Sequence, residues 1–144
     1  MTYVVHTASP FPLEAPKDEN ELIRPAVQGT LAVMRAAHKH KVKRVVITSS
    51  IAAIYGQKPE NQKLVYNEND WTDINTVGPY EKSKTLAERA AWDYFYSIPE
   101  SERFELVIIN PVIILGPSLI PGHFTSGAII RKLMSGVYPA TVKI

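Results

Sequence analysis

The amino-acid sequence predicts an α/β protein, namely part of a doubly wound parallel sheet with flanking helices. Short apolar segments alternate along the chain with longer amphipathic ones, in the order strand, helix, strand, helix, strand, helix. The apolar segments are nearly continuous, which is typical of parallel strands that are buried on both faces. Because three strands are few for such a sheet, we expect the chain to be part of a longer domain.

The first strand is expected at residues 3–8, which are short and β-branched. Pro10 and Pro12 stop it, since proline cannot donate a hydrogen bond to a neighbouring strand. The chain should therefore leave the sheet in a loop.

The spacing of apolar residues predicts a helix over residues 18–41. Asp18 or Asn20 can cap its start. Pro25 lacks an amide proton, so the helix either begins near Arg24 or bends there. The positions that recur at helical spacing are Ile23, Val27, Leu31 and Met34.

A second buried strand is expected at residues 44–50, followed by a long excursion loop at 56–79 that is rich in Gly, Pro, Asn and Asp. A second helix should run from about Pro79 to Ser97, with proline in its first turn and Pro99 closing it. The third strand, at 104–109, should break at Asn110-Pro111 and resume at 112–115, and residues 124–135 can form a last helix.

The composition excludes several classes of function. The chain has 144 residues, 45% of them hydrophobic and 21% charged, so it is an ordinary globular sequence. A net charge of +2 gives no field for nucleic acid, which we do not expect as a partner. The absence of cysteine excludes disulfides, thiolate zinc sites and cysteine nucleophiles. No apolar run approaches the ~18 residues of a membrane span and no signal peptide is visible, so a cytoplasmic protein without membrane contact is expected.

Tyr80 and Lys84 stand four apart in the second predicted helix, so their Cβ atoms should lie within about 6 Å on one face. That face continues through Ala87, Ala91, Tyr94 and Ile98 and is the apolar side. Burial lowers the pKa of a lysine, and a lysine's positive charge favours the phenolate of a neighbouring tyrosine. The pair can therefore exchange a proton near neutral pH, although so short a pattern also arises by chance.

Three consecutive hydroxyls, Thr48, Ser49 and Ser50, end the second strand, where the ligand crevice of a parallel sheet lies. A donor there could bond a substrate carbonyl oxygen while the tyrosine protonates it. The alternative is that these hydroxyls turn the chain and cap the next segment. At the end of the third strand, exposed backbone at Asn110-Pro111 could hold a planar amide, but a strand that ends at proline needs no function to explain it.

Five short motifs stand out along the sequence. They are His6-Thr7-Ala8-Ser9-Pro10, Pro25-Ala26-Val27-Gln28-Gly29-Thr30, Val46-Ile47-Thr48-Ser49-Ser50, Tyr80-Glu81-Lys82-Ser83-Lys84, and Asn110-Pro111-Val112 through Gly116-Pro117. With these motifs in this order, the sequence resembles the extended short-chain dehydrogenase/reductase family, in particular the subgroup of dihydroflavonol reductases, cinnamoyl-CoA reductases and fungal methylglyoxal reductases. Glu68-Asn69-Asp70-Trp71 in the long loop also matches that subgroup.

The resemblance implies a Rossmann-type NAD(P)-binding domain that reduces a ketone or aldehyde of a small-molecule substrate. It implies that Ser50 polarises the substrate carbonyl, although Ser49 is one residue away and could replace it. By the same resemblance Tyr80 is the general acid, and Lys84 holds the nicotinamide ribose and lowers the tyrosine pKa. The cofactor would be NADP, with NAD possible, and no metal is expected. The further cofactor contacts would be Thr7, Ala8, Pro111, Val112 and Ile113, and Phe124 would line the substrate site.

The sequence also departs from that family. Its glycines, at 29, 56, 78, 116, 122, 127 and 136, do not form the Gly-x-x-Gly-x-x-Gly turn that holds the cofactor pyrophosphate. Gln28 stands where many relatives carry asparagine, which puts a proton relay through that position in doubt. We therefore expect residues 1–144 to be a single incomplete domain, its catalytic half, with the substrate region beginning at about 117–144. Such a chain should be inactive alone.

Two alternatives remain open at this point. Sugar-nucleotide epimerases and dehydratases share the Ser, Tyr and Lys set and the fold, although the tryptophan-containing loop and the His-Thr-Ala-Ser-Pro turn favour the reductases. The chain could also be a truncated, non-catalytic product that binds a partner. The carbonyl substrate, the choice between NADP and NAD, and the oligomeric state cannot be predicted from the sequence.

Overall fold

The computed structural model of the protein describes residues 1–11, 16–117 and 125–137, and it consists of two compact units, Met1–Val112 and Ile113–Ile144. The second unit contains the helix α3 (Thr125–Met134). The first unit contains β1 (Tyr3–His6), α1 (Asn20–Lys39), β2 (Arg44–Thr48), α2 (Pro79–Ser97) and β3 (Glu105–Ile109), with short 3-10 helices η1 (Ile51–Ala53), η2 (Pro59–Asn61) and η3 (Glu100–Glu102).

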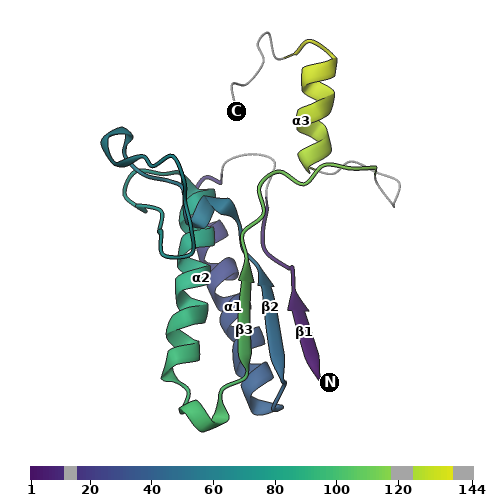
Figure 1. Ribbon diagram of the computed structural model, residues 1–144. Helices are drawn as coiled ribbons and strands as arrows, with labels where there is room; N and C mark the ends of the chain where they lie inside the picture. The colour runs from purple at the N-terminus through teal and green to yellow at the C-terminus, as the bar shows by residue number, and fades with distance from the viewer. Residues whose placement is uncertain (12–15, 118–124, 138–144) are drawn as a thin grey trace. The chain divides into compact units, whose positions relative to one another are not determined.

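The three strands of the first unit form one parallel sheet in the order β1-β2-β3 (Figure 1). In its register Val4, Val45 and Leu106 lie side by side. The pairing of β2 with β3 continues beyond the strands, because the Ser49 amide donates to the Ile109 carbonyl (2.8 Å) and the Ile51 amide donates to the Pro111 carbonyl (3.0 Å). The carboxyl ends of the two strands are thus held together where the predicted site lies.

Helices α1 and α2 both cover the same face of this sheet (Figure 1). The predicted class, a parallel sheet with flanking helices, is confirmed. In the described residues, however, the helices lie on one face only, and Val5, Val107 and Ile109 on the other face are exposed. The core between sheet and helices is formed by Met34, Ala37, Val42, Val45, Ile47, Ala91, Ile98 and Phe104.

Helix α1 begins at Asn20 and contains Pro25, so the helix does not start at Arg24. The N-cap residue is Glu19 and not Asp18 or Asn20 as predicted, although the Asp18 carboxylate, one residue earlier, accepts a hydrogen bond from the Asn20 amide (2.9 Å). The predicted apolar stripe was displaced by about one residue, since only Met34 of its four positions is fully buried. Ile23, Val27 and Leu31 are only partly buried. The buried face is Leu22, Ala26, Thr30, Met34 and Ala37.

Helix α2 agrees with its prediction in both bounds and face. Proline occupies its first turn, and Ala87, Ala91 and Ile98 are buried. The predicted resumption of a strand at 112–115 is wrong, because these residues are irregular and exposed. The chain leaves the sheet at Pro111, whose nitrogen cannot donate to a ladder. None of the helices in the described ranges is long and apolar enough to cross a bilayer.

Candidate active site

Lys84 is buried in the second turn of α2, with only 9% of its surface exposed. Its Nζ lies 5.9 Å from the centroid of the Tyr80 ring, one turn earlier on the helix. Tyr80 is half-buried, and its ring lies 4.9 Å from that of Phe11. Burial holds the pKa of Lys84 below the ordinary lysine value. No ion pair to Lys84 is present among the described residues.

Ser50 follows β2 with extended backbone and caps the helix η1. Its Oγ accepts a hydrogen bond from the Ala52 amide (3.2 Å), and the residue is only 9% exposed. Because a serine hydroxyl carries one proton besides its acceptor sites, Ser50 can still donate to another oxygen. The capping role and the donor role that the sequence offered as alternatives are therefore compatible in one side chain.

Ser49 is also buried, but its Oγ makes no hydrogen bond with any described part of the chain. It borders a cavity of about 20 Å³, enclosed by α1, α2 and the strand ends. A space of this size has room for about one water molecule. Other residues that line it are His6, Ala8, Thr30, Lys84 and Glu88.

His6 brings the carboxyl end of β1 to the same cavity. The imidazole is buried, and burial together with the positive charge of Lys84 lowers its pKa. A neutral imidazole is therefore favoured beside the buried ammonium. Thr7 and Ala8, the next residues of the chain, are exposed.

The end of β3 contributes a side chain that the sequence did not single out. The Asn110 amide nitrogen donates to the Ser50 carbonyl (3.0 Å) and to the Glu88 carboxylate (2.8 Å). Glu88 is 6% exposed and lies one turn beyond Lys84 on α2. The sequence could have pointed to Glu88, because it follows Lys84 at the same spacing of four residues that separates Tyr80 from Lys84. Pro111 and Val112, which the sequence predicts as cofactor contacts, come next in the chain after Asn110, and Val112 is exposed.

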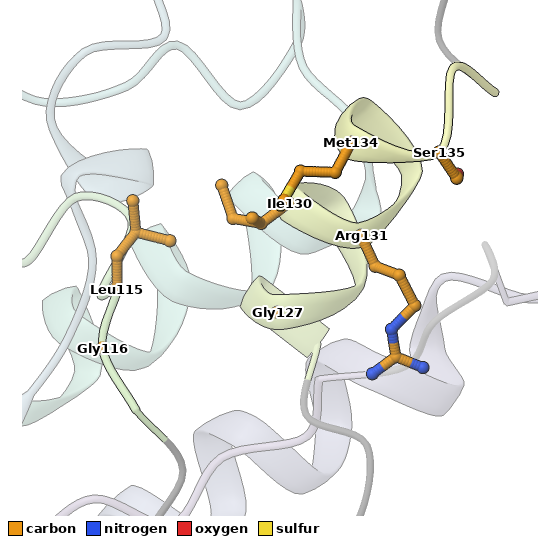
Figure 2. A pocket seen from close by; sticks show the side chains of 7 residues that line it. All are labelled: Leu115, Gly116, Gly127, Ile130, Arg131, Met134 and Ser135. Carbon is orange, nitrogen blue, oxygen red and sulfur yellow. The ribbon is translucent and has the colours of Figure 1, made fainter.

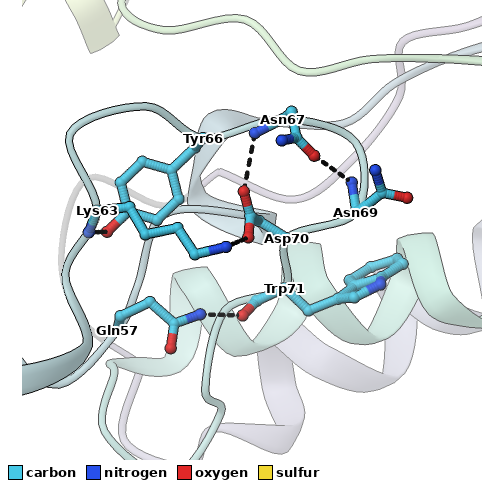
Figure 3. A network of polar contacts seen from close by, with 7 residues as sticks. All are labelled: Gln57, Lys63, Tyr66, Asn67, Asn69, Asp70 and Trp71. Atoms are coloured by element: carbon cyan, nitrogen blue, oxygen red, sulfur yellow. Dashed lines mark hydrogen bonds and ion pairs between the residues drawn. The ribbon is translucent and has the colours of Figure 1, made fainter.

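The long loop returns to the site at Thr72, which is fully buried. Its hydroxyl donates to the Ala52 carbonyl (2.7 Å) and accepts from the Gly56 amide (2.9 Å), so it fastens the loop to the turn after Ser50. Figure 3 shows a network of polar contacts in the part of the loop that precedes Thr72. In this network the Asp70 carboxylate accepts hydrogen bonds from Lys63 and from the Asn67 amide (2.9 Å). These bonds, first of all the one from Lys63, lower the pKa of Asp70.

The Arg89 guanidinium of α2 lies 5.1 Å from the centroid of the Trp71 ring, which anchors the loop on that helix. Trp92 packs instead against Phe95 and Tyr96 on its own helix. Both tryptophans thus act in packing.

The second unit contains a cavity of about 740 Å³ with a mainly apolar lining. Figure 2 shows the side chains of Leu115 and Ile130 beside it. Ile113, a predicted cofactor contact, belongs to this unit and is exposed. Phe124, the predicted substrate contact, lies outside the described residues.

No group of three or more His, Asp or Glu side chains in the described part of the chain could hold a metal ion. His38 contacts the Tyr94 hydroxyl (3.3 Å) and Glu102 (3.2 Å), and His40 is exposed at the end of α1. Gln28 is exposed on α1.

The geometry thus places a Tyr–Lys pair and two buried serines at the carboxyl edge of a parallel sheet, and comparison with known proteins decides the family. Residues 1–142 match the NAD dependent epimerase/dehydratase family. The chain belongs to this family.

Several curated members of the epimerase/dehydratase family are similar to the chain. A cinnamoyl-CoA reductase from Medicago truncatula is 42% identical over 139 residues, covering 92% of the chain and 41% of that protein. The NADPH-dependent methylglyoxal reductase of Saccharomyces cerevisiae is 38% identical over 147 residues, covering 91% and 43%. The chain therefore spans about two fifths of the length of these relatives.

The fold of the chain also matches a solved family structure. The crystal structure of the yeast methylglyoxal/isovaleraldehyde reductase complexed with NADPH superposes with a TM-score of 0.81 and 34% identity, covering 94% of the chain and 44% of that structure. The predicted resemblance to the reductase subgroup is confirmed.

Proposed function

We propose that the whole protein to which this chain belongs is an NADPH-dependent reductase that converts a ketone or aldehyde to an alcohol. The observation that carries the proposal is the buried Lys84 ammonium facing the Tyr80 ring at the strand ends. The names of the similar relatives, a cinnamoyl-CoA reductase and a methylglyoxal reductase, support reduction of a carbonyl in preference to epimerisation of a sugar nucleotide.

Each residue has a separate task in this proposal. Bound NADPH supplies the hydride for the carbonyl carbon. Ser50 donates its free hydroxyl proton to the carbonyl oxygen and stabilises the negative charge that develops there. Tyr80 gives that oxygen its proton as general acid. The Lys84 ammonium, 5.9 Å from the centroid of the Tyr80 ring, stabilises the phenolate that this proton transfer leaves.

The strand ends also suit the nicotinamide end of the cofactor. Lys84 has ammonium protons for the ribose hydroxyls, since it makes no ion pair within the described ranges. Thr7, Ala8 and Val112 leave exposed groups after β1 and β3. We propose these residues, with Pro111 and Ile113, as cofactor contacts.

The cavity of the second unit supports a proposal for the substrate class. We propose that the substrate region begins there, as the sequence predicts for residues 117–144 and for Phe124. The apolar lining of its cavity suits the non-polar part of a small carbonyl compound. A cytoplasmic location and the absence of a nucleic-acid partner remain predictions from composition.

Steady-state oxidation of NADPH in the presence of aldehydes and ketones tests the function. A full-length version of the protein should reduce them, whereas the 144-residue chain alone should not oxidise NADPH measurably. Turnover by the chain alone would show that it is complete in function. Interconversion of sugar nucleotides by the full-length version without net consumption of NADPH would replace the reductase proposal with the epimerase one.

A further inference from the structure

The side-chain amide of Asn110 joins three elements of the first unit. Its nitrogen carries two protons, and each can serve one of the two bonds that it makes, to the Ser50 carbonyl (3.0 Å) and to the Glu88 carboxylate (2.8 Å). The bond to the carboxylate is of the charge-assisted kind, which is stronger than a neutral one. One amide therefore connects the ends of β2 and β3 to the middle of α2.

These elements carry the proposed catalytic groups. Backbone bonds already fix the end of β2 to the end of β3, through Ser49 and Ile109 (2.8 Å) and through Ile51 and Pro111 (3.0 Å). Helix α2, which carries Tyr80 and Lys84, has no such backbone tie to the strand ends within the described ranges. Among the hydrogen bonds of the described residues, the one from Asn110 to Glu88 joins α2 to the strand ends.

We infer that Glu88 and Asn110 are positioning residues, which hold α2 and the turn at Ser50 in the arrangement that lets the Ser50 hydroxyl and the Tyr80 phenol meet one carbonyl oxygen. This inference rests on the proposed function. Neither residue needs to touch the substrate for this role. Glu88 acts through Asn110, and Asn110 acts through the backbone of Ser50.

The chemistry at position 88 supports a role beyond packing. Glu88 is 6% exposed and lies on the stripe that also contains Ala87 and Ala91. Burying a carboxylate costs free energy that an apolar side chain at the same place does not. Glu88 makes no ion pair with Lys84, the neighbouring described residue one turn earlier on α2. Its visible partner is the Asn110 amide.

Substitutions in the full-length version test the inference by steady-state kinetics. Glu88→Ala and Asn110→Ala each lose the tie and should lower kcat by about tenfold to a hundredfold, since small misplacements of reacting groups cost that much. Glu88→Gln keeps an oxygen that accepts from Asn110 and should stay within about threefold of the parent. The double alanine variant should be no worse than the poorer single one.

The pH profile of kcat/KM separates positioning from electrostatics. If Glu88 only holds α2 in position, kcat/KM of Glu88→Ala is lower at every pH, and its pH profile keeps the shape of the parent's profile. A shifted profile, or a Glu88→Gln variant as slow as Glu88→Ala, would mean that the charge of the carboxylate matters, and would overturn the inference. Thr85→Val is the matched control, because it removes another buried side-chain hydrogen bond of α2, to the Glu81 carbonyl (2.7 Å), away from this tie. An equal loss of kcat in that variant would reduce Glu88 to a general structural role.

Thermal unfolding of the 144-residue chain tests the tie without turnover. Melting temperatures of Glu88→Ala, Asn110→Ala and the double variant should show coupling, with the double loss smaller than the sum of the single losses. Additive losses would overturn the tie itself. Normal turnover in Tyr80→Phe would instead overturn the proposed function while leaving this measurement unaffected.

Discussion

The Nζ atom of Lys84 lies 5.9 Å from the centroid of the Tyr80 ring, and the lysine is 9% exposed. Burial lowers the pKa of this ammonium. Much of the chemistry proposed for the protein depends on this pair.

Tyr80→Phe removes the proposed proton donor and leaves the ring in place against Phe11. Turnover of the full-length version should fall about a hundredfold or more, the usual contribution of a general acid. The dissociation constant for NADPH, measured by calorimetry, should stay the same. Tyr96→Phe is the control, since Tyr96 lies on the same helix and is exposed. Normal turnover of Tyr80→Phe would exclude Tyr80 as the acid.

Ser49→Ala and Ser50→Ala distinguish the two adjacent serines. Ser50→Ala loses the bond from the Ala52 amide and should lower the free energy of unfolding by about 1 kcal/mol. It should also slow turnover, because the proposed carbonyl donor is gone. Ser49→Ala removes a buried hydroxyl that has no partner in the described chain, so the free energy of unfolding should stay equal or rise by up to about 1 kcal/mol. If Ser49→Ala is the slower variant, the assignment moves to Ser49.

The stability of the protein should depend on alkaline pH through Lys84. Burial lowers the pKa of Lys84 in the folded state from the ordinary 10.5, so in the range between the lowered value and 10.5 the unfolded chain binds more protons. The free energy of unfolding should therefore rise with pH in that range. Below the lowered pKa of Lys84 the whole cost of burying the charge is present.

Lys84→Met removes this cost. We expect the variant to be more stable than the parent at pH 7 in urea unfolding, with the difference shrinking as the pH rises toward 10.5. Lys39→Met, at an exposed position in the last turn of α1, controls for the loss of a lysine. A Lys84→Met variant that is less stable than the parent at pH 7 would show that the lysine contributes more by its contacts than its burial costs.

The sequence alone was sufficient to predict the order of the helices and the three strands. It was also sufficient to predict that Tyr80 and Lys84 share one face of α2, because this depends only on the periodicity of one helix. It was insufficient for the contact between Asn110 and Glu88, which are 22 residues apart in sequence, because that contact depends on how α2 packs against the end of β3. It also misplaced the buried stripe of α1, because alanine and threonine weigh little in an apolar pattern but allow close helix packing. The strand expected at 112–115 failed because an apolar run does not by itself provide a pairing partner.

Gly56→Ala should loosen the turn after Ser50. A Cβ atom at this position would lie 2.6 Å from Thr72 Cγ2 and 2.7 Å from Val77 Cγ1, so both side chains, or the backbone at Gly56, must move. Overpacking of this kind costs about 1–3 kcal/mol. Because Thr72 also bonds the Ala52 carbonyl (2.7 Å), its movement should disturb the turn and slow turnover in the full-length version as well.

Gly29→Ala is the matched substitution with the opposite sign. Gly29 lies inside α1, and a Cβ atom there meets nothing within 4 Å. Alanine should therefore stabilise the helix by about 0.5–1 kcal/mol. Urea unfolding of the two variants measures both effects. Equal stability of Gly56→Ala and the parent would show that Thr72 and Val77 can yield without cost, in which case the loop does not hold the turn at Ser50 in place.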